Sequence, residues 1–230
     1  MSSIIETVNY DKNTIQVFET MASVPNSLYI VTSAIGQGKS IFTMSYINYL
    51  KKIHKKKYDK IIIISPTIFN GYYTKNGIPK ADQYDDISIE QLKIIQEYQK
   101  KHPNKKLLLV MDDIFSSNLS LKSDELDKII ATMRHYGISI LFILQNIYMI
   151  SRKIRSNAHS LILFSISGHQ NLKALHDAIS CGESFQQFSK QFYENTRQHR
   201  GIFVNCLKGP LDEDRLINFK IDIKKFGVKL

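Results

Sequence analysis

The stretch that decides the fold is Leu28-Tyr29-Ile30-Val31-Thr32-Ser33-Ala34-Ile35-Gly36-Gln37-Gly38-Lys39-Ser40. Its first part, residues 28–32, is apolar and β-branched, which is typical of a buried strand. Gly36 and Gly38 then precede Lys39 and Ser40, and apolar residues recur at helical spacing over residues 41–53. A strand, a glycine-rich loop and a helix in this order predict a loop that binds the phosphates of a nucleotide.

The predicted nucleotide-binding residues are Ser33, Ala34, Ile35, Gly36, Gln37, Gly38, Lys39, Ser40 and Ile41. Gly36 and Gly38 leave the backbone free to take positive φ and to turn its N–H groups toward phosphate oxygens. Lys39 is expected to reach the β- and γ-phosphates, and the Ser40 hydroxyl to bind Mg²⁺. Ser33 stands where the pattern G-x-x-x-x-G-K-[ST] has its first glycine, and a chance turn is the alternative. The flanking strand and helix favour binding of ATP and Mg²⁺.

A second apolar run, residues 107–111, ends in two carboxylates, Asp112 and Asp113. A buried parallel strand carries such groups to the carboxyl edge of the sheet, where ligands of open α/β sheets bind. We expect Asp112 to hold Mg²⁺, directly or through a water, and Asp113 to orient or deprotonate the attacking water. The alternative is a strand that leaves the core with two solvated acids in a turn.

Gln145 follows another predicted strand, residues 138–144. An amide at this place can contact both the γ-phosphate and the attacking water and so sense hydrolysis. A strand-terminating glutamine that bonds to local backbone is an equal alternative. Charge that develops during hydrolysis can also be neutralised by an arginine of a neighbouring subunit. Arg134, Arg152 and Arg155 are candidates, although any one of them taken alone is more simply a solvated side chain.

The rest of the chain alternates strands with helices. Further strands are expected at residues 61–64 and 161–166, a long loop at 68–86, helices at 88–101 (with Ser88 as N-cap), 124–135, 169–179 and 184–195, and final strands at 202–207 and 216–223 around a turn at 209–212. This alternation predicts an α/β fold of three layers, with a mostly parallel sheet covered on both faces and a C-terminal β-hairpin. We expect one domain over residues 28–230, preceded by a lead-in segment over residues 1–27.

Composition sets the outer limits. No apolar stretch of the chain approaches the length of about 18 residues that predicts a membrane span, and the start has no secretory signal. Cys181 and Cys206 cannot form a four-ligand zinc site by themselves and are expected as free thiols. The formal net charge of +10 fits a polyanion partner such as nucleic acid, and equally an AT-rich genome. Tyrosines of the long loop, Tyr72, Tyr73 and Tyr84, either stack on bases or, more simply, cover the loop.

Several segments, taken in order, carry a resemblance to a known family. They are residues 33–40, 107–113, 133–139 and 154–164, with Gln145 at the end of the strand between the last two. Together they resemble the FtsK–HerA superfamily of DNA-pumping ATPases, and most of all the poxvirus-type genome-packaging ATPases of large DNA viruses and virophages. The resemblance covers residues 28–180 and implies a RecA/FtsK-like P-loop NTPase fold.

The resemblance also implies a function and partners. It implies a homo-oligomeric ring, pentamer or hexamer, that hydrolyses ATP to drive double-stranded DNA into a capsid, docked on a capsid vertex or portal protein. The expected place is the host cytoplasm, a virus factory or the virion. Lys39 and Ser40 would contact the nucleotide, Asp112 and Asp113 the metal and water, and Gln145 would be the sensor. Where some members carry the trans-acting arginine this chain has Lys173, so Arg155 is the first candidate and Arg134 the second.

The residues alone indicate only an Mg²⁺-dependent ATPase with a polyanionic partner, so other functions remain open. A nucleotide kinase shares the loop, but the Arg-rich lid usual in such enzymes is not found in the sequence. An NTP-gated assembly factor is a second alternative, against which the complete set of Lys39, Asp112, Asp113 and Gln145 counts. A helicase or a plasmid-transfer ATPase is a third.

Overall fold

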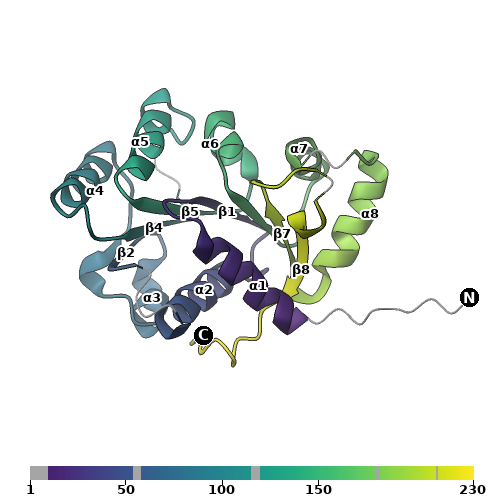
Figure 1. Ribbon diagram of the computed structural model, residues 1–230, viewed down its shortest axis with the longest axis horizontal. Coiled ribbons are helices and arrows are strands. Elements are labelled where there is room, and N and C mark those ends of the chain that lie inside the picture. The colour runs from purple at the N-terminus through teal and green to yellow at the C-terminus, as the bar shows by residue number, and fades with distance from the viewer. Residues whose placement is uncertain (1–9, 54–57, 115–119, 180–181, 211) are drawn as a thin grey trace, which may run out of the picture.

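The computed structural model describes residues 10–53, 58–114, 120–179, 182–210 and 212–230. A central sheet lies between two layers of helices (Figure 1). The strands of the sheet are β1 (Leu28–Thr32), β2 (Lys60–Ile64), β3 (Gln83–Tyr84), β4 (Leu107–Asp112), β5 (Ile138–Leu144), β6 (Ser160–Leu163), β7 (Arg200–Asn205) and β8 (Leu216–Lys220). The helices are α1 (Tyr10–Ser23), α2 (Lys39–Ile53), α3 (Tyr72–Lys75), α4 (Ile89–Lys101), α5 (Asp124–His135), α6 (Arg152–Ser156), α7 (His169–Ile179) and α8 (Phe185–Thr196).

The strand order places β1 in the middle of the sheet. The order is β3-β2-β4-β5-β1-β6-β7-β8. Pairing is parallel from β3 to β6, and β7 and β8 add an antiparallel hairpin at one edge. Ile30 of β1 lies between Phe142 of β5 and Leu161 of β6. The predicted α/β class, the mostly parallel sheet and the C-terminal hairpin are confirmed.

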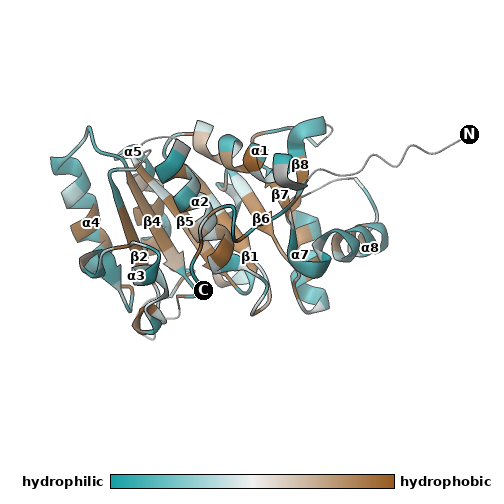
Figure 2. Ribbon diagram, turned by 90° about the horizontal axis from the view of Figure 1, so that it is seen from below, coloured by the Kyte–Doolittle hydropathy of each residue, from teal (hydrophilic) through white to brown (hydrophobic). Residues whose placement is uncertain are grey.

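Both faces of the sheet are buried, which explains the continuous apolar strands. Leu28 and Ile30 of β1 belong to a hydrophobic cluster that includes residues of α4, α5, α6, α7 and α8. Tyr29 and Val31 belong to the opposite cluster, with residues of α1, α2 and the C-terminal segment. In Figure 2 the central strands are mostly hydrophobic, whereas the helices around them carry both hydrophilic and hydrophobic residues.

Helix α1 is a difference from the sequence prediction, which placed only a lead-in segment over residues 1–27. Val17, Phe18 and Met21 are fully buried. The Asn13 side chain donates to the Asn218 carbonyl of β8 at 2.7 Å, and the Thr14 hydroxyl donates to the Lys220 carbonyl at 2.8 Å. The lead-in thus contains a helix packed on the C-terminal hairpin. Residues 1–9 lie outside the described residues.

The predicted loop over residues 68–86 also has structure of its own. It contains α3, β3 and two short 3₁₀ turns, Ile68–Asn70 and Lys80–Asp82. Gly71, with φ of 73°, ends the first turn, and Gly77, with φ of 80°, follows α3. The elements of this segment are too short to show a periodicity in the sequence. The predicted N-cap of α4 is confirmed, because the Ser88 hydroxyl accepts the Gln91 N–H at 3.1 Å.

The C-terminal segment runs back over the layer that holds α2 and α3. The predicted strand over residues 216–223 ends at Lys220, and Leu211 of the predicted turn lies outside the described residues. The Asn48 side chain of α2 donates to the Phe226 carbonyl at 3.0 Å. Cys206 is a free thiol, as predicted, and Cys181 lies outside the described residues. Within the described ranges, no helix has the length and apolar character to cross a membrane.

Candidate active site

The glycine-rich loop leaves the carboxyl end of β1 and is held there by both neighbouring strands. The Ser33 N–H donates to the Leu144 carbonyl at 3.2 Å, and the Ala34 N–H donates to the Ser165 carbonyl at 2.8 Å. Gly36 and Gly38 have φ of +75° and +98°, the left-handed region that favours glycine. Ser33 does not have positive φ, and its hydroxyl donates to the Ala34 carbonyl at 2.7 Å. Serine therefore fits the position that the motif gives to a first glycine.

Lys39 begins α2 and directs its ammonium group back into the loop. Its Nζ donates to the Ser33 carbonyl at 3.1 Å and to the Ala34 carbonyl at 3.4 Å. The side chain is 7% exposed, and Nζ lies 3.9 Å from Asp113 Oδ2. Burial lowers the pKa of Lys39, while the negative charges of Asp113 and Asp112 oppose that effect. The loop therefore holds a cation against the carboxyl end of β4.

The two adjacent carboxylates differ in their surroundings. Asp112 ends β4 and is 5% exposed. Burial raises its pKa to about 6, and a hydrogen bond from Tyr73 opposes the rise. Asp113 leaves the strand with φ of +46°, a conformation that is uncommon for non-glycine residues and clusters at functional sites. Its Oδ1 is buried and has no hydrogen-bond partner among the described residues.

Gln145 follows β5, the strand between β1 and β4. Its Nε2 donates to Asp113 Oδ2 at 3.1 Å. The Asp113 N–H donates in turn to the Ile143 carbonyl of the same strand at 2.9 Å. Of the two alternatives left open by the sequence, the observed contact is with the predicted catalytic carboxylate rather than with local backbone. The structure thus brings Lys39, Asp113 and Gln145 together, and their roles in hydrolysis remain predictions.

The predicted metal residues share a neighbour that the sequence did not single out. The Tyr73 hydroxyl of α3 donates to Asp112 Oδ2 at 2.5 Å. Burial and the Asp112 charge raise the pKa of Tyr73, and a hydrogen bond with the Ser40 side chain opposes the rise. The Tyr73 hydroxyl therefore lies against Asp112 of β4 and near Ser40 of α2.

The residues present fit a nucleotide-bound Mg²⁺. Ser40, Asp112 and Asp113 offer oxygen ligands only, which Mg²⁺ prefers, and Mg²⁺ takes its remaining ligands from waters and substrate phosphates. The unpartnered Asp113 Oδ1 is a group that a water or metal-bound water would satisfy. Ser40 and Asp112 would hold the ion, and Asp113 would face the water.

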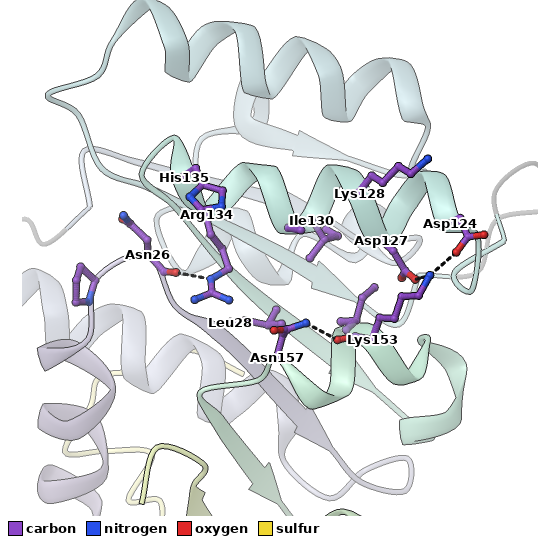
Figure 3. A pocket seen from close by; sticks show the side chains of 13 residues that line it. Asn26, Leu28, Asp124, Asp127, Lys128, Ile130, Arg134, His135, Lys153 and Asn157 are labelled. Atoms are coloured by element: carbon purple, nitrogen blue, oxygen red, sulfur yellow. Dashed lines mark hydrogen bonds and ion pairs between the residues drawn. The ribbon is translucent and has the colours of Figure 1, made fainter.

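Arg134 lies at the amino end of β1, the opposite edge of the sheet from the loop. Its Nε donates to the Asn26 carbonyl at 3.1 Å, and its Nη2 lies 2.9 Å from His159 Nε2. A groove of about 670 Å³ runs here between α5 and α6. Figure 3 shows Arg134 at one end of this groove and the Lys153–Asp124 ion pair, 2.6 Å long, at the other.

Arg155 lies on α6 in a second pocket, of about 600 Å³, that Arg152 and Arg215 also line. Its Nη1 donates to the Ile150 carbonyl at 2.6 Å, and its guanidinium lies 5.3 Å from the centre of the Tyr148 ring. Among the described residues, the hydrogen bonds of Arg155 and Arg134 go to partners outside the glycine loop. A role in the site of a neighbouring subunit stays a prediction for both.

Comparison with known proteins places the chain in a family. A family model described as the poxvirus A32 protein matches residues 18–191. B204, the DNA-packaging ATPase from Sulfolobus turreted icosahedral virus, has a TM-score of 0.63 and 17% identity over 86% of this chain and 98% of that chain. The genome packaging NTPase B204 of Sulfolobus turreted icosahedral virus 2, in complex with AMPPCP, has a TM-score of 0.64 and 16% identity over 86% of this chain and 100% of that chain.

A secretion protein shares the fold over part of its length. The cytoplasmic domain of the Thermomonospora curvata type VII secretion ATPase EccC has a TM-score of 0.51 and 14% identity over 84% of this chain and 25% of that chain. No curated protein matches the chain. At these identities the solved structures show the fold, and the family model spans most of the chain, from α1 to α8. The chain belongs to the poxvirus A32 protein family, and its fold is that of the P-loop NTPases.

Proposed function

We propose that the protein is an Mg²⁺-dependent ATPase that drives double-stranded DNA into a viral capsid. The observation that carries this proposal is the meeting of Lys39, Asp113 and Gln145 at the carboxyl edge of the sheet, beside Ser40 and Asp112. The poxvirus A32 family and the packaging NTPase fold support it. The enzyme class is therefore ATP hydrolase.

Each residue has a part that follows from its place. Lys39, freed from the Ser33 and Ala34 carbonyls, would neutralise the β- and γ-phosphates. Asp113 has an unpartnered oxygen with which to accept a proton from the attacking water, and Gln145 holds its other oxygen in place. Bound Mg²⁺ would supply neutralisation of the charge that develops on the phosphate oxygens.

The DNA part of the proposal rests on charge and family. A net charge of +10 favours contact with a polyanion, and phosphate contacts grip DNA without reading its sequence. The protein would act as a homo-oligomeric ring, pentamer or hexamer, with Arg155, or else Arg134, reaching the nucleotide of the neighbouring subunit. It would dock on a capsid vertex or portal protein in the host cytoplasm or virus factory, or with the virion.

Steady-state ATP hydrolysis with and without linear double-stranded DNA, at two salt concentrations, tests the proposal. DNA should stimulate turnover, and the stimulation should fade as salt rises, because counterion release drives phosphate contacts. Lys39→Ala provides the background, since it removes the charge that holds the phosphates. Omission of Mg²⁺ should reduce turnover to that background. Magnesium-dependent turnover that DNA does not change at either salt concentration would support the ATPase activity and contradict the proposed role as a DNA motor.

A further inference from the structure

Tyr73 stands between two residues that the proposed function gives to the metal. Its hydroxyl donates to Asp112 Oδ2 at 2.5 Å, and the Ser40 side chain is close enough to oppose the rise of its pKa. Its side chain is 1% exposed, so water does not compete for these contacts. An ion bound by Asp112 Oδ2 would lie at roughly 2.0–2.1 Å from that oxygen. The Tyr73 hydroxyl, at 2.5 Å from the same oxygen, occupies that space.

The neighbouring tyrosine shows that only one hydroxyl has this role. Tyr72 packs edge-on against Tyr73, with ring centres 5.4 Å apart. Its hydroxyl is buried as well, yet it has no hydrogen-bond partner among the described residues. Two adjacent residues of α3 therefore each carry a buried hydroxyl, and of these two only the Tyr73 hydroxyl bonds to the predicted metal ligand.

Helix α3 is short, and hydrogen bonds tie it to the C-terminal segment and to the residues that follow it. The Asn76 side chain, after α3, donates to the Lys229 carbonyl and accepts the Lys229 N–H, both at 2.8 Å. Within the segment, the Ile78 N–H donates to the Tyr73 carbonyl at 3.0 Å and the Lys75 N–H to the Gly71 carbonyl at 2.9 Å. Withdrawal of Tyr73 from Asp112 would strain these bonds.

We propose that the Tyr73 hydroxyl is a built-in competitor for the metal site: it donates to Asp112 beside Ser40, and must withdraw, with α3, before these two residues can bind the ion. The inference rests on the proposed assignment of Ser40 and Asp112 to Mg²⁺. Tyr73 is in this sense a positioning residue, which acts on the reaction through Asp112.

The test measures metal affinity rather than turnover. The probe is Mn²⁺, titrated by electron paramagnetic resonance into the full chain saturated with ADP. Tyr73→Phe should bind Mn²⁺ about fivefold more tightly than the unmodified protein, because a hydrogen bond to a charged group no longer has to be broken. Tyr72→Phe, which removes the unpartnered hydroxyl next to it, is the matched control and should stay within about twofold of the unmodified protein.

The outcomes separate this inference from the proposed function. If the unmodified protein–ADP complex binds no Mn²⁺, the assignment of Ser40 and Asp112 fails. If it binds Mn²⁺ and Tyr73→Phe binds with equal or weaker affinity, the metal site stands and the competition is overturned. ADP binding in EDTA shows whether each variant is folded.

A second measurement needs no variant. Hydrogen–deuterium exchange of the unmodified protein should become faster in residues 71–78 when Mn²⁺ is added to the ADP complex, because withdrawal of Tyr73 loosens the bonds of α3. Exchange that is unchanged or slower in this segment, with Mn²⁺ bound, overturns the inference even if Tyr73→Phe does not fold.

Discussion

Asp112 and Asp113 are neighbours in the chain with different surroundings, and this difference supports the separate roles proposed for them. Asp112 is buried in the last position of β4 with Tyr73 as its partner. Asp113 is 25% exposed and is turned out of the strand by its positive φ. A general base must reach both water and substrate, so Asp113 is the member of the pair that can act as one.

Asp113→Asn should therefore keep nucleotide binding and lose turnover by about 10²-fold or more, the usual contribution of a general base. Asparagine tolerates the left-handed conformation, so the backbone at this position should be unchanged. Affinity for a fluorescent ADP and steady-state hydrolysis check the two halves separately. Turnover equal to that of the unmodified protein would contradict the assignment of the base.

At this scale the sequence predicts what is local. Ser33 to Ser40 and the Asp112–Asp113 pair are short motifs next to their own strands, and the structure places them as expected at the carboxyl edge. Tyr73 carries no such signal, because it lies 39 residues from Asp112 and meets it only through the path of the segment after β2. The contact of Gln145 with Asp113 likewise depended on strand order, which the sequence alone left open.

At the scale of the elements, the imidazole ring of His159, just before β6, contacts both the start of β1 and the end of α5. The Leu28 N–H donates to His159 Nδ1 at 3.1 Å, and Arg134 approaches Nε2. Burial lowers the pKa of His159, and the Arg134 charge lowers it further. Because both neighbours are hydrogen-bond donors, protonation of the ring is unfavourable in the folded protein.

This arrangement predicts a pH dependence of stability. Below about pH 6.5 the unfolded chain protonates His159 while the folded protein resists it, so the unfolded state binds more protons. The stabilisation is therefore present above that pH and is lost as pH falls toward the lower folded pKa. His159→Gln should reduce the loss of unfolding free energy between about pH 7.5 and about pH 5.5, measured by urea unfolding. His135→Gln, at an exposed position of α5, is the control, and an equal change in both variants would contradict the role of His159.

The hairpin of β7 and β8 depends on a glycine for close packing. A Cβ at Gly201 would lie 2.5 Å from Phe219 Cζ, and the Phe219 ring is itself packed against Phe42 and Phe164. Gly201→Ala should lower the free energy of unfolding by about 1–3 kcal/mol through overpacking. Gly209→Ala is the control, since its added carbon would meet nothing closer than 3.6 Å. Equal unfolding midpoints of the two variants would show that the hairpin yields to the extra methyl group.

The helices and strands that can be predicted from the sequence are those long enough for their apolar residues to show a regular spacing. The apolar strands β1, β2, β4, β5 and β6 are continuous because both faces are covered, and α4, α5, α7 and α8 show helical spacing. The short helix α3 has no room for a period. Helix α1 was missed because its buried side, Val17, Phe18 and Met21, is narrow among polar residues.

For the whole molecule, the predicted ring can be tested by mixing. Arg155→Ala subunits combined with unmodified ones should reduce ATP hydrolysis more steeply than their fraction, because one altered subunit disables the site of its neighbour. The same mixing with Arg197→Ala, an exposed arginine at the end of α8, should give a loss no steeper than its fraction. Hydrolysis that falls in strict proportion to the Arg155→Ala fraction would argue against a trans role.

The packing of α1 on β8 has a consequence for synthesis on the ribosome. The first described helix is made early, while Asn218 and Lys220, which accept its hydrogen bonds, are made near the end of the described chain. At translation speeds of about 5–20 residues per second, α1 waits roughly 10–40 seconds for its strand. During that time Val17, Phe18 and Met21 lack part of the surface that later covers them. The nascent chain therefore exposes an amphipathic helix until β8 has been made, and its yield in a host cell should depend on chaperones that bind such helices.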